Sequence, residues 1–229
     1  MMDKILMMLQ LQQQLNDSTN GENWTEGLTK NGKEINWKRC IYMECAEMID
    51  SFSWKHWKNI SQEPDWDNLK IEVVDVWHFI MSLAIEEYAK NMRGQLEDLA
   101  QQLSEVPSYQ IVKNPNDSFA TQKEIIEKVE LLMIDALNRK SLDISNMAND
   151  FFELVVMSGL DITTLYRLYV GKNILNQFRQ DHGYKEGTYI KNWNGVEDNV
   201  IMKRIWEENG DIQPAVLYKK MQEVYDKLA

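Results

Sequence analysis

Residues 71–81 constrain the fold of this chain more than any other stretch of its sequence. Drawn as a helix, they are apolar around nearly the whole circumference, which is typical of a helix that is buried on all sides. Two acids, Glu72 and Asp75, lie in this segment and are therefore predicted to be buried too. A buried carboxylate costs several kcal/mol unless it is paired or binds a cation. Because residues 71–81 contain no Lys or Arg, the compensating charge must come from elsewhere.

A second acidic pair has the same spacing. Glu44 and Glu47 are three residues apart in another expected helix, which places both carboxylates on nearly the same face. If the two helices pack antiparallel, four carboxylates converge, and their mutual repulsion demands compensating positive charge. Oxygen ligands suit Mg²⁺ or Mn²⁺ rather than Zn²⁺, and Mg²⁺ commonly shares its coordination sphere with substrate phosphates. The two pairs therefore predict a Mg²⁺ site for phosphate chemistry, in which Mn²⁺ can substitute.

The acidic pairs are also compatible with a purely structural role. Glu124, Glu127 and Glu130 have the same spacing, which is usual on a solvated helix face, and salt bridges to basic residues would also neutralise buried acids. A carboxylate-bridged di-iron centre is a further alternative, but it requires Glu-x-x-His on two helices. Asp75 with His78 is the single acid-x-x-His match in the sequence, so di-iron chemistry is disfavoured.

Composition favours a helical globular protein. The 229 residues are 44% apolar, enough for a sizeable core, and they include only four Pro and ten Gly. We predict an all-α fold with one catalytic domain over residues 1–229. A long loop with two prolines is expected over residues 104–118. Helices are expected over residues 3–16, 37–52, 67–91, 121–139, 144–157 and 162–180, with a final helical segment toward the C-terminus.

Charge and hydropathy exclude several classes of protein. A net charge of −11 argues against binding to nucleic acid, because no basic surplus is available to displace counterions. The opening residues lack the apolar stretch and cleavage site expected of a signal peptide, and no segment reaches the roughly 20 apolar residues expected of a membrane span. Cys40 and Cys45 lie five residues apart in one expected helix, where they are poorly placed to form a disulfide. We therefore expect a soluble cytoplasmic protein without a membrane partner.

Four stretches of the sequence form a pattern known from one family of enzymes. The first is residues 11–16 (LQQQLN), and the second is residues 44–47 (ECAE) with two tryptophans downstream. The third is residues 72–79 (EVVDVWHF), and the fourth is residues 171–189, which include GKNILNQFRQ and GYKEGTY. Together they resemble the dimeric all-α dUTPases of the all-α NTP pyrophosphatase superfamily. Residues 96–159 carry no matching motif.

The resemblance implies both an architecture and a reaction. The fold would be a helical bundle with a rigid core and a smaller mobile lobe, assembled as a homodimer. Glu44, Glu47, Glu72 and Asp75 would coordinate Mg²⁺ ions that bridge the polyphosphate, and Glu47 would also orient or deprotonate the attacking water. The enzyme would convert dUTP to dUMP and pyrophosphate, or dUDP to dUMP and phosphate, and so keep uracil out of DNA.

Candidate contacts to the nucleoside lie in the first three stretches. Gln12 and Asn16, four residues apart, carry amides that match the acceptors and donor of the uracil edge, although such a pair can equally form a solvent-facing stripe. A single buried histidine such as His78 is by default a hydrogen-bonded core residue. Because four acids are expected beside it, His78 is alternatively a contact to substrate. Trp54 and Trp57 either stack on the base or, more commonly for aromatic residues, pack in the core.

Candidate contacts to the phosphates lie in the fourth stretch. Lys172, Asn176 and Arg179 follow spacings of four and three, so they form one helical stripe suited to phosphate oxygens. Without the resemblance, this stripe would be an ordinary surface helix with basic residues. Tyr184 and Lys185 lie on the Gly-rich segment that follows, which is expected to fold over the nucleotide as a lid.

Two alternative functions remain from the sequence. A pyrophosphatase for another nucleotide, such as dCTP, would keep the acidic residues without a preference for uracil. An acidic helical scaffold without catalysis would tolerate Glu47→Gln in every assay except one of stability.

Overall fold

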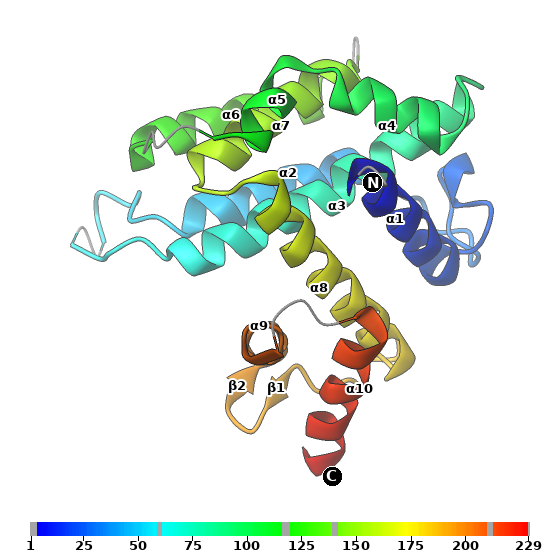
Figure 1. Cartoon of the computed structure of the whole chain (residues 1–229), viewed down its shortest axis with the longest axis vertical. Helices are drawn as coiled ribbons and strands as arrows, with labels where there is room; N and C mark the ends of the chain where they lie inside the picture. Colours follow the sequence, from blue (N-terminus) through cyan, green and yellow to red (C-terminus); the bar gives the residue numbers. More distant parts are fainter. Residues whose placement is uncertain (1–3, 59–60, 116–119, 139–141, 210–212, 229) are drawn as a thin grey trace. The chain divides into compact units, whose positions relative to one another are not determined.

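The computed structural model describes residues 4–58, 61–115, 120–138, 142–209 and 213–228, and helices dominate them (Figure 1). The prediction of an all-α fold is confirmed. The chain divides into two compact units, Met1–Tyr166 and Arg167–Ala229, called the first and second unit below. Among the described residues no helix is both long and apolar enough to cross a membrane.

The first unit contains seven complete α-helices within its described residues, together with a short 3-10 helix, η1 (Trp24–Glu26). An eighth helix, α8 (Ile162–Asp181), starts in this unit and continues into the second. The seven helices are α1 (Lys4–Asn20), α2 (Trp37–Asp50), α3 (Trp66–Lys90), α4 (Leu96–Ser104), α5 (Pro107–Lys113), α6 (Gln122–Leu137) and α7 (Ile144–Met157).

Helices α2 and α3 form the antiparallel pair that the sequence suggested. Trp37, at the start of α2, stacks on Phe79 in the middle of α3 with ring centroids 6.0 Å apart. At the other end, the carbonyl of Ser51 after α2 accepts a 2.8 Å hydrogen bond from the amide of Asp65, which precedes α3. The Asp65 side chain in turn caps α3 by accepting from the amide of Asn68 at 2.9 Å. These contacts fix the register in which Glu44 of α2 meets Glu72 and Asp75 of α3.

The long helix α3 is buried along most of its length, as its apolar circumference predicted. Trp77 is fully buried and stacks on Phe151 of α7, with ring centroids 4.8 Å apart and planes 10° apart. Glu72 is buried as expected, whereas Asp75 is only partly covered. The helix therefore carries its acids at the boundary between the apolar core and solvent.

The predicted loop over residues 104–118 is wrong in its central part. Helix α5 occupies residues 107–113 of that stretch, and α4 ends where the loop was expected to begin. Pro107 is the first residue of α5, a position where proline is tolerated because its missing N–H has no intrahelical acceptor. The predicted helix ends at residues 3 and 139, and residues 116–118 of the predicted loop, lie outside the described residues.

The second unit has its own small core, and its final segment is more varied than predicted. The core contains Phe178 of α8, together with Trp193 and Leu217 from the later elements. A short antiparallel hairpin pairs Trp193 with Val196 and precedes two separate helices in place of one continuous segment. The elements after α8 are β1 (Asn192–Trp193), β2 (Val196–Glu197), α9 (Asp198–Asn209), α10 (Pro214–Tyr225) and the 3-10 helix η2 (Asp226–Leu228).

Candidate active site

Three acids from α2 and α3 form a compact carboxylate cluster in the first unit. Glu44 of α2 and Glu72 and Asp75 of α3 each place a carboxylate oxygen within 4.8 Å of the others. Glu72 is buried, while Glu44 and Asp75 are partly exposed, so one side of the cluster stays open to solvent. Converging carboxylate oxygens with an open side are the donor set that a hard divalent cation sharing ligands with a phosphate requires. The cluster is therefore able to hold a divalent metal ion.

Glu47, the fourth predicted acid, is placed differently. It follows Glu44 by one turn of α2, but its side chain is exposed and it is not one of the three clustered acids. Four carboxylates were expected to gather in a shielded pocket, and the structure brings three of them together. The metal-binding roles of all four acids, and the role of Glu47 toward water, stay predictions.

The negative charge of Glu44 affects the two cysteines of α2. Burial, with a further contribution from the nearby carboxylate of Glu44, raises the pKa of the Cys45 thiol to about 12. Burial and Glu44 likewise raise the pKa of Cys40. Both cysteines are free thiols, as their spacing predicted, and the raised pKa values favour the protonated thiol at neutral pH.

A buried polar network connects α1 to α3 one to two turns beyond the acids. Gln12 Nε2 donates to Asn16 Oδ1 at 3.2 Å and to Ser82 Oγ at 3.0 Å, and Asn16 Nδ2 donates to Ser82 Oγ at 2.9 Å. His78 Nδ1 lies 2.6 Å from Gln12 Oε1, and Ser82 Oγ donates to the carbonyl of His78 at 2.8 Å. Gln12 and Asn16 are 3% and 4% exposed, so the alternative of a solvent-facing stripe is wrong.

Trp54 and Trp57 lie after α2, on the irregular segment that leads to α3. Trp54 is 43% exposed and Trp57 is 64% exposed, so the expectation that they pack in the core is wrong. Their rings meet edge to face with centroids 5.6 Å apart, and Trp54 Nε1 donates to Asp50 Oδ1 at 2.8 Å. The segment thus presents aromatic surface to solvent, which leaves the stacking role of Trp57 as a prediction.

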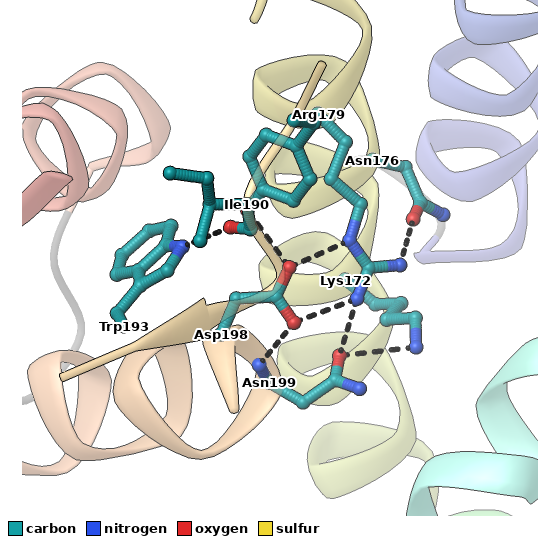
Figure 2. A network of polar contacts seen from close by, with 8 residues as sticks. Lys172, Asn176, Arg179, Ile190, Trp193, Asp198 and Asn199 are labelled. Atoms are coloured by element: carbon teal, nitrogen blue, oxygen red, sulfur yellow. Dashed lines mark hydrogen bonds and ion pairs between the residues drawn. The ribbon is translucent and has the colours of Figure 1, made fainter. Parts of the chain in front are cut away.

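The predicted phosphate-binding stripe is part of a hydrogen-bonded network in the second unit (Figure 2). Arg179 binds Asp198, the first residue of α9, in a bidentate ion pair: Nε donates to Oδ2 and Nη2 to Oδ1, both at 2.8 Å. Arg179 Nη1 also donates to Asn176 Oδ1 at 3.4 Å, and Lys172 Nζ donates to Asn199 Oδ1 at 3.1 Å. The three predicted side chains therefore belong to one network with the start of α9, and the interpretation of this stripe as an ordinary surface helix is wrong.

The Arg179–Asp198 pair controls the charge of both side chains. Burial alone would raise the pKa of Asp198, but the hydrogen bonds and charge of Arg179 hold it below its ordinary value. Burial correspondingly disfavours the charged guanidinium, yet Asp198 raises the pKa of Arg179 overall. Tyr189 donates to Asp198 Oδ2 at 2.8 Å, and burial together with this carboxylate raises the pKa of the Tyr189 hydroxyl. Asp198 therefore stays ionised and neutralises Arg179 at physiological pH.

Tyr184 and Lys185 lie in the exposed turn after α8, as the Gly-rich sequence predicted. The Tyr184 ring faces two cations: the guanidinium carbon of Arg179 is 5.8 Å from its centroid, and Lys191 Nζ is 5.5 Å away. This turn therefore collects positive charge near the Arg179 network.

Sequence reasoning missed three residues that organise these networks. Ser82 follows His78 by four residues, so its position on the same face of α3 was available from the helical period. Asp198 and Asn199 lie far along the chain from Arg179, and no local pattern of the sequence connects them to it.

The chain was also compared with known proteins. Residues 4–184, well over half of the chain, match the sequence model of the family described as dUTPase. The chain belongs to the all-α dUTPase family. It is therefore an enzyme that hydrolyses dUTP, and the alternative of a scaffold without catalysis is wrong.

The match with the dUTPase family covers the carboxylate cluster and the α1–α3 network. It also includes Lys172, Asn176 and Arg179, and it ends at Tyr184, before the Asp198 partner of Arg179. The chain matches none of the curated proteins with which it was compared. Family membership establishes the hydrolysis of dUTP in general.

Proposed function

We propose that this dUTPase is Mg²⁺-dependent and hydrolyses both dUTP and dUDP to dUMP, releasing pyrophosphate or phosphate. The observation that carries the proposal is the convergence of Glu44, Glu72 and Asp75 within 4.8 Å from two antiparallel helices. The donor atoms are all carboxylate oxygens. Mg²⁺ and Mn²⁺ prefer oxygen ligands, whereas Zn²⁺ is bound mainly by nitrogen and sulfur. The partly open side of the cluster leaves room for phosphate oxygens and water.

Glu44, Glu72 and Asp75 are the proposed metal ligands, and Glu47 is proposed as a further ligand and as the catalytic base. Bound there, Mg²⁺ would offset the charge of the polyphosphate and make a coordinated water more acidic. The exposed carboxylate of Glu47, one helical turn from Glu44, is accessible to a water molecule from solvent. Its role is to orient that water and accept its proton as the water attacks phosphorus.

The α1–α3 network is the proposed contact for uracil. Asp75, His78 and Ser82 share one side of α3, and the rise of an α-helix places Ser82 about 10 Å beyond Asp75. An extended nucleotide separates its phosphates from its base edge by a distance of this order. Asn16 and Gln12 are the proposed amide contacts to the base. His78 is proposed to contact the nucleoside, and the exposed ring of Trp57 is proposed to stack on the base.

The second unit is the proposed source of positive charge for the phosphates. Lys172 and Lys185 carry that charge, and Tyr184 lies beside Lys185 on the turn after α8. Asn176 and Arg179, whose charge Asp198 offsets, add N–H donors. Because Asp198 occupies two of the guanidinium donors, its proposed effect is to hold Arg179 in one orientation. Lys185, which is exposed, is proposed as a direct phosphate contact.

We further propose that the enzyme acts as a homodimer in the cytoplasm, where removal of dUTP keeps uracil out of DNA. The free thiols of Cys40 and Cys45 are in keeping with a reducing compartment. The dimer follows from the resemblance to the dimeric members of the family, and sedimentation equilibrium tests it by the mass of the particle.

Release of phosphate and pyrophosphate from dUTP, dUDP, dCTP and dTTP tests the proposed activity. With Mg²⁺ we expect dUTP to give dUMP and pyrophosphate, dUDP to give dUMP and phosphate, and dCTP to react far more slowly. EDTA should abolish release, and excess Mg²⁺ should restore it. Turnover that persists in EDTA contradicts the metal, an inert dUDP contradicts the diphosphate activity, and equal turnover of dCTP favours a pyrophosphatase of broader range.

A further inference from the structure

Ser82 occupies the centre of the polar network between α1 and α3, and its hydroxyl is fully used there. The side chain is 0% exposed. Its single hydrogen goes to the backbone carbonyl of His78, which can only accept. Its two lone pairs face Gln12 Nε2 at 3.0 Å and Asn16 Nδ2 at 2.9 Å. One hydroxyl therefore contacts both amides that the sequence singled out.

This arrangement determines which way each amide points. Because the Ser82 hydrogen is already committed to a carbonyl, only donors satisfy the lone pairs of its oxygen. The NH₂ group of Gln12 and that of Asn16 must face Ser82, and their carbonyl oxygens must point away from it. A flipped amide would place two acceptors against each other in a buried site, which is strongly unfavourable.

The orientation extends from the amides to the imidazole. With its NH₂ group directed to Ser82 and to Asn16 Oδ1, Gln12 presents Oε1 to His78 Nδ1 at 2.6 Å. An amide oxygen accepts, so Nδ1 of His78 carries a proton, and whenever the ring is neutral Nε2 is the acceptor nitrogen. The hydroxyl of Ser82 thus selects one tautomer of His78 through the Gln12 amide, without a hydrogen bond to the imidazole ring itself.

We propose that Ser82 is the positioning residue for base selection: by fixing the Asn16 amide, it makes the enzyme prefer uracil to cytosine. The inference rests on the proposed function, in which Asn16 contacts the base. Within the network, Asn16 uses one hydrogen of Nδ2 and one lone pair of Oδ1, so the same amide keeps one donor and one acceptor for a ligand.

The chemistry of the two bases explains why orientation decides the preference. Uracil offers an N3–H donor beside carbonyl acceptors, so it pairs with an amide whose oxygen faces N3 and whose NH₂ faces a carbonyl. Cytosine has an acceptor at N3 and a donor at the neighbouring amino group, so it pairs with the same amide turned by 180°. An amide that is free to turn serves both bases, and an amide fixed by Ser82 serves one.

Replacing Ser82 with alanine tests this inference. We expect S82A to lower the ratio of kcat/KM for dUTP to kcat/KM for dCTP by about ten- to a hundredfold, the size of one correctly oriented pair of hydrogen bonds to a base. Most of the change should come from better turnover of dCTP. S108A is the matched control, because Ser108 of α5 is equally buried, donates to Glu153 Oε1 at 3.2 Å and lies outside the α1–α3 network. It should leave the ratio unchanged.

A spectroscopic measurement without nucleotide separates positioning from general damage to the fold. The ¹⁵N shifts of the His78 ring should report a proton fixed on Nδ1 in the wild type and a mixture of tautomers in S82A, with S108A matching the wild type. If S82A keeps both the wild-type ratio and the Nδ1–H tautomer, Ser82 has no positioning role. If the wild type itself does not distinguish dUTP from dCTP, the proposed contact of Asn16 with the base fails instead. A changed tautomer with an unchanged ratio also overturns the role of Ser82 in base selection.

Discussion

At the scale of single residues, the structure separates acids that look equivalent in the sequence. Glu44 and Glu47 have the same spacing as Glu72 and Asp75, yet only Glu47 lies outside the carboxylate cluster and is exposed. A clustered carboxylate and an exposed one suit different tasks. The first suits metal binding, because it adds charge to a shared site, and the second suits proton transfer, because water reaches it freely.

Two single substitutions distinguish these tasks. Glu47→Gln should lower kcat for dUTP by about 10²- to 10⁴-fold, as loss of a general base does. It should raise the Mg²⁺ concentration needed for half-maximal rate less than Glu72→Gln does, because Glu47 lies outside the carboxylate cluster. Glu72→Gln should raise that Mg²⁺ concentration, because it removes charge from the metal site. Glu130→Gln, an exposed acid of α6, is the control and should match the wild type in both quantities. Steady-state rates over a Mg²⁺ titration measure both effects, and a wild-type kcat in Glu47→Gln would contradict the assignment of the base.

At the scale of elements, the second unit depends on an ion pair between two helices. Arg179 of α8 and Asp198 at the start of α9 are both buried, and Tyr189 and Asn199 add hydrogen bonds around the carboxylate. A buried pair stabilises the contact only while both partners are charged, since loss of one charge leaves the other uncompensated. The packing of α9 on α8 is therefore coupled to the protonation of Asp198.

The pKa of Asp198 predicts how this packing responds to acid. Its folded-state pKa is lower than the unfolded value, which is about 3.9 for an aspartate, so the pair contributes its full stability above that value. The contribution is lost as pH falls through the lower, folded-state pKa. Hydrogen exchange of α9 amides, corrected for intrinsic rates, should show constant protection down to about pH 4 and declining protection below it. Asp198→Asn should lower the protection already at neutral pH, whereas Glu208→Gln, an exposed change on the same helix, should not.

At the scale of the whole molecule, the chain combines a net charge of −11 with an active site that gathers further negative charge. A folded protein that concentrates carboxylates in this way gains stability from a cation that binds it and does not bind the unfolded chain. The metal proposed for catalysis should therefore also be a ligand that stabilises the fold.

Thermal unfolding with and without Mg²⁺ measures this coupling. At a Mg²⁺ concentration 100 times its dissociation constant, binding adds about 2.7 kcal/mol to the free energy of unfolding. For a chain of this length that corresponds to a rise in Tm of about 5–10 °C. Glu72→Gln should lose most of the rise and Glu130→Gln should keep it. An equal rise in all three proteins would show that Mg²⁺ acts elsewhere than at the cluster.

Much of the fold and part of the site followed from local patterns. The apolar circumference of residues 71–81 determined a buried helix, and acids three residues apart determined that its carboxylates share a face, because a helix repeats every 3.6 residues whatever surrounds it. The same period predicted most helices of the first unit. The prediction failed at Pro107, which was assigned to a loop and is the first residue of α5. Proline breaks a helix in its interior but is tolerated at its first position, and the sequence alone did not distinguish these two cases.

The contacts between residues far apart in the chain were decided by the tertiary structure alone. Ser82 meets Gln12 and Asn16 only because α3 packs against α1, and Asp198 meets Arg179 only because α9 packs on α8. The exposure of Glu47 likewise depends on which side of α2 its neighbours cover. Hydrogen bonds and ion pairs act over a few ångströms, so their partners are set by packing, whereas the helices that carry them are set by the period of the sequence.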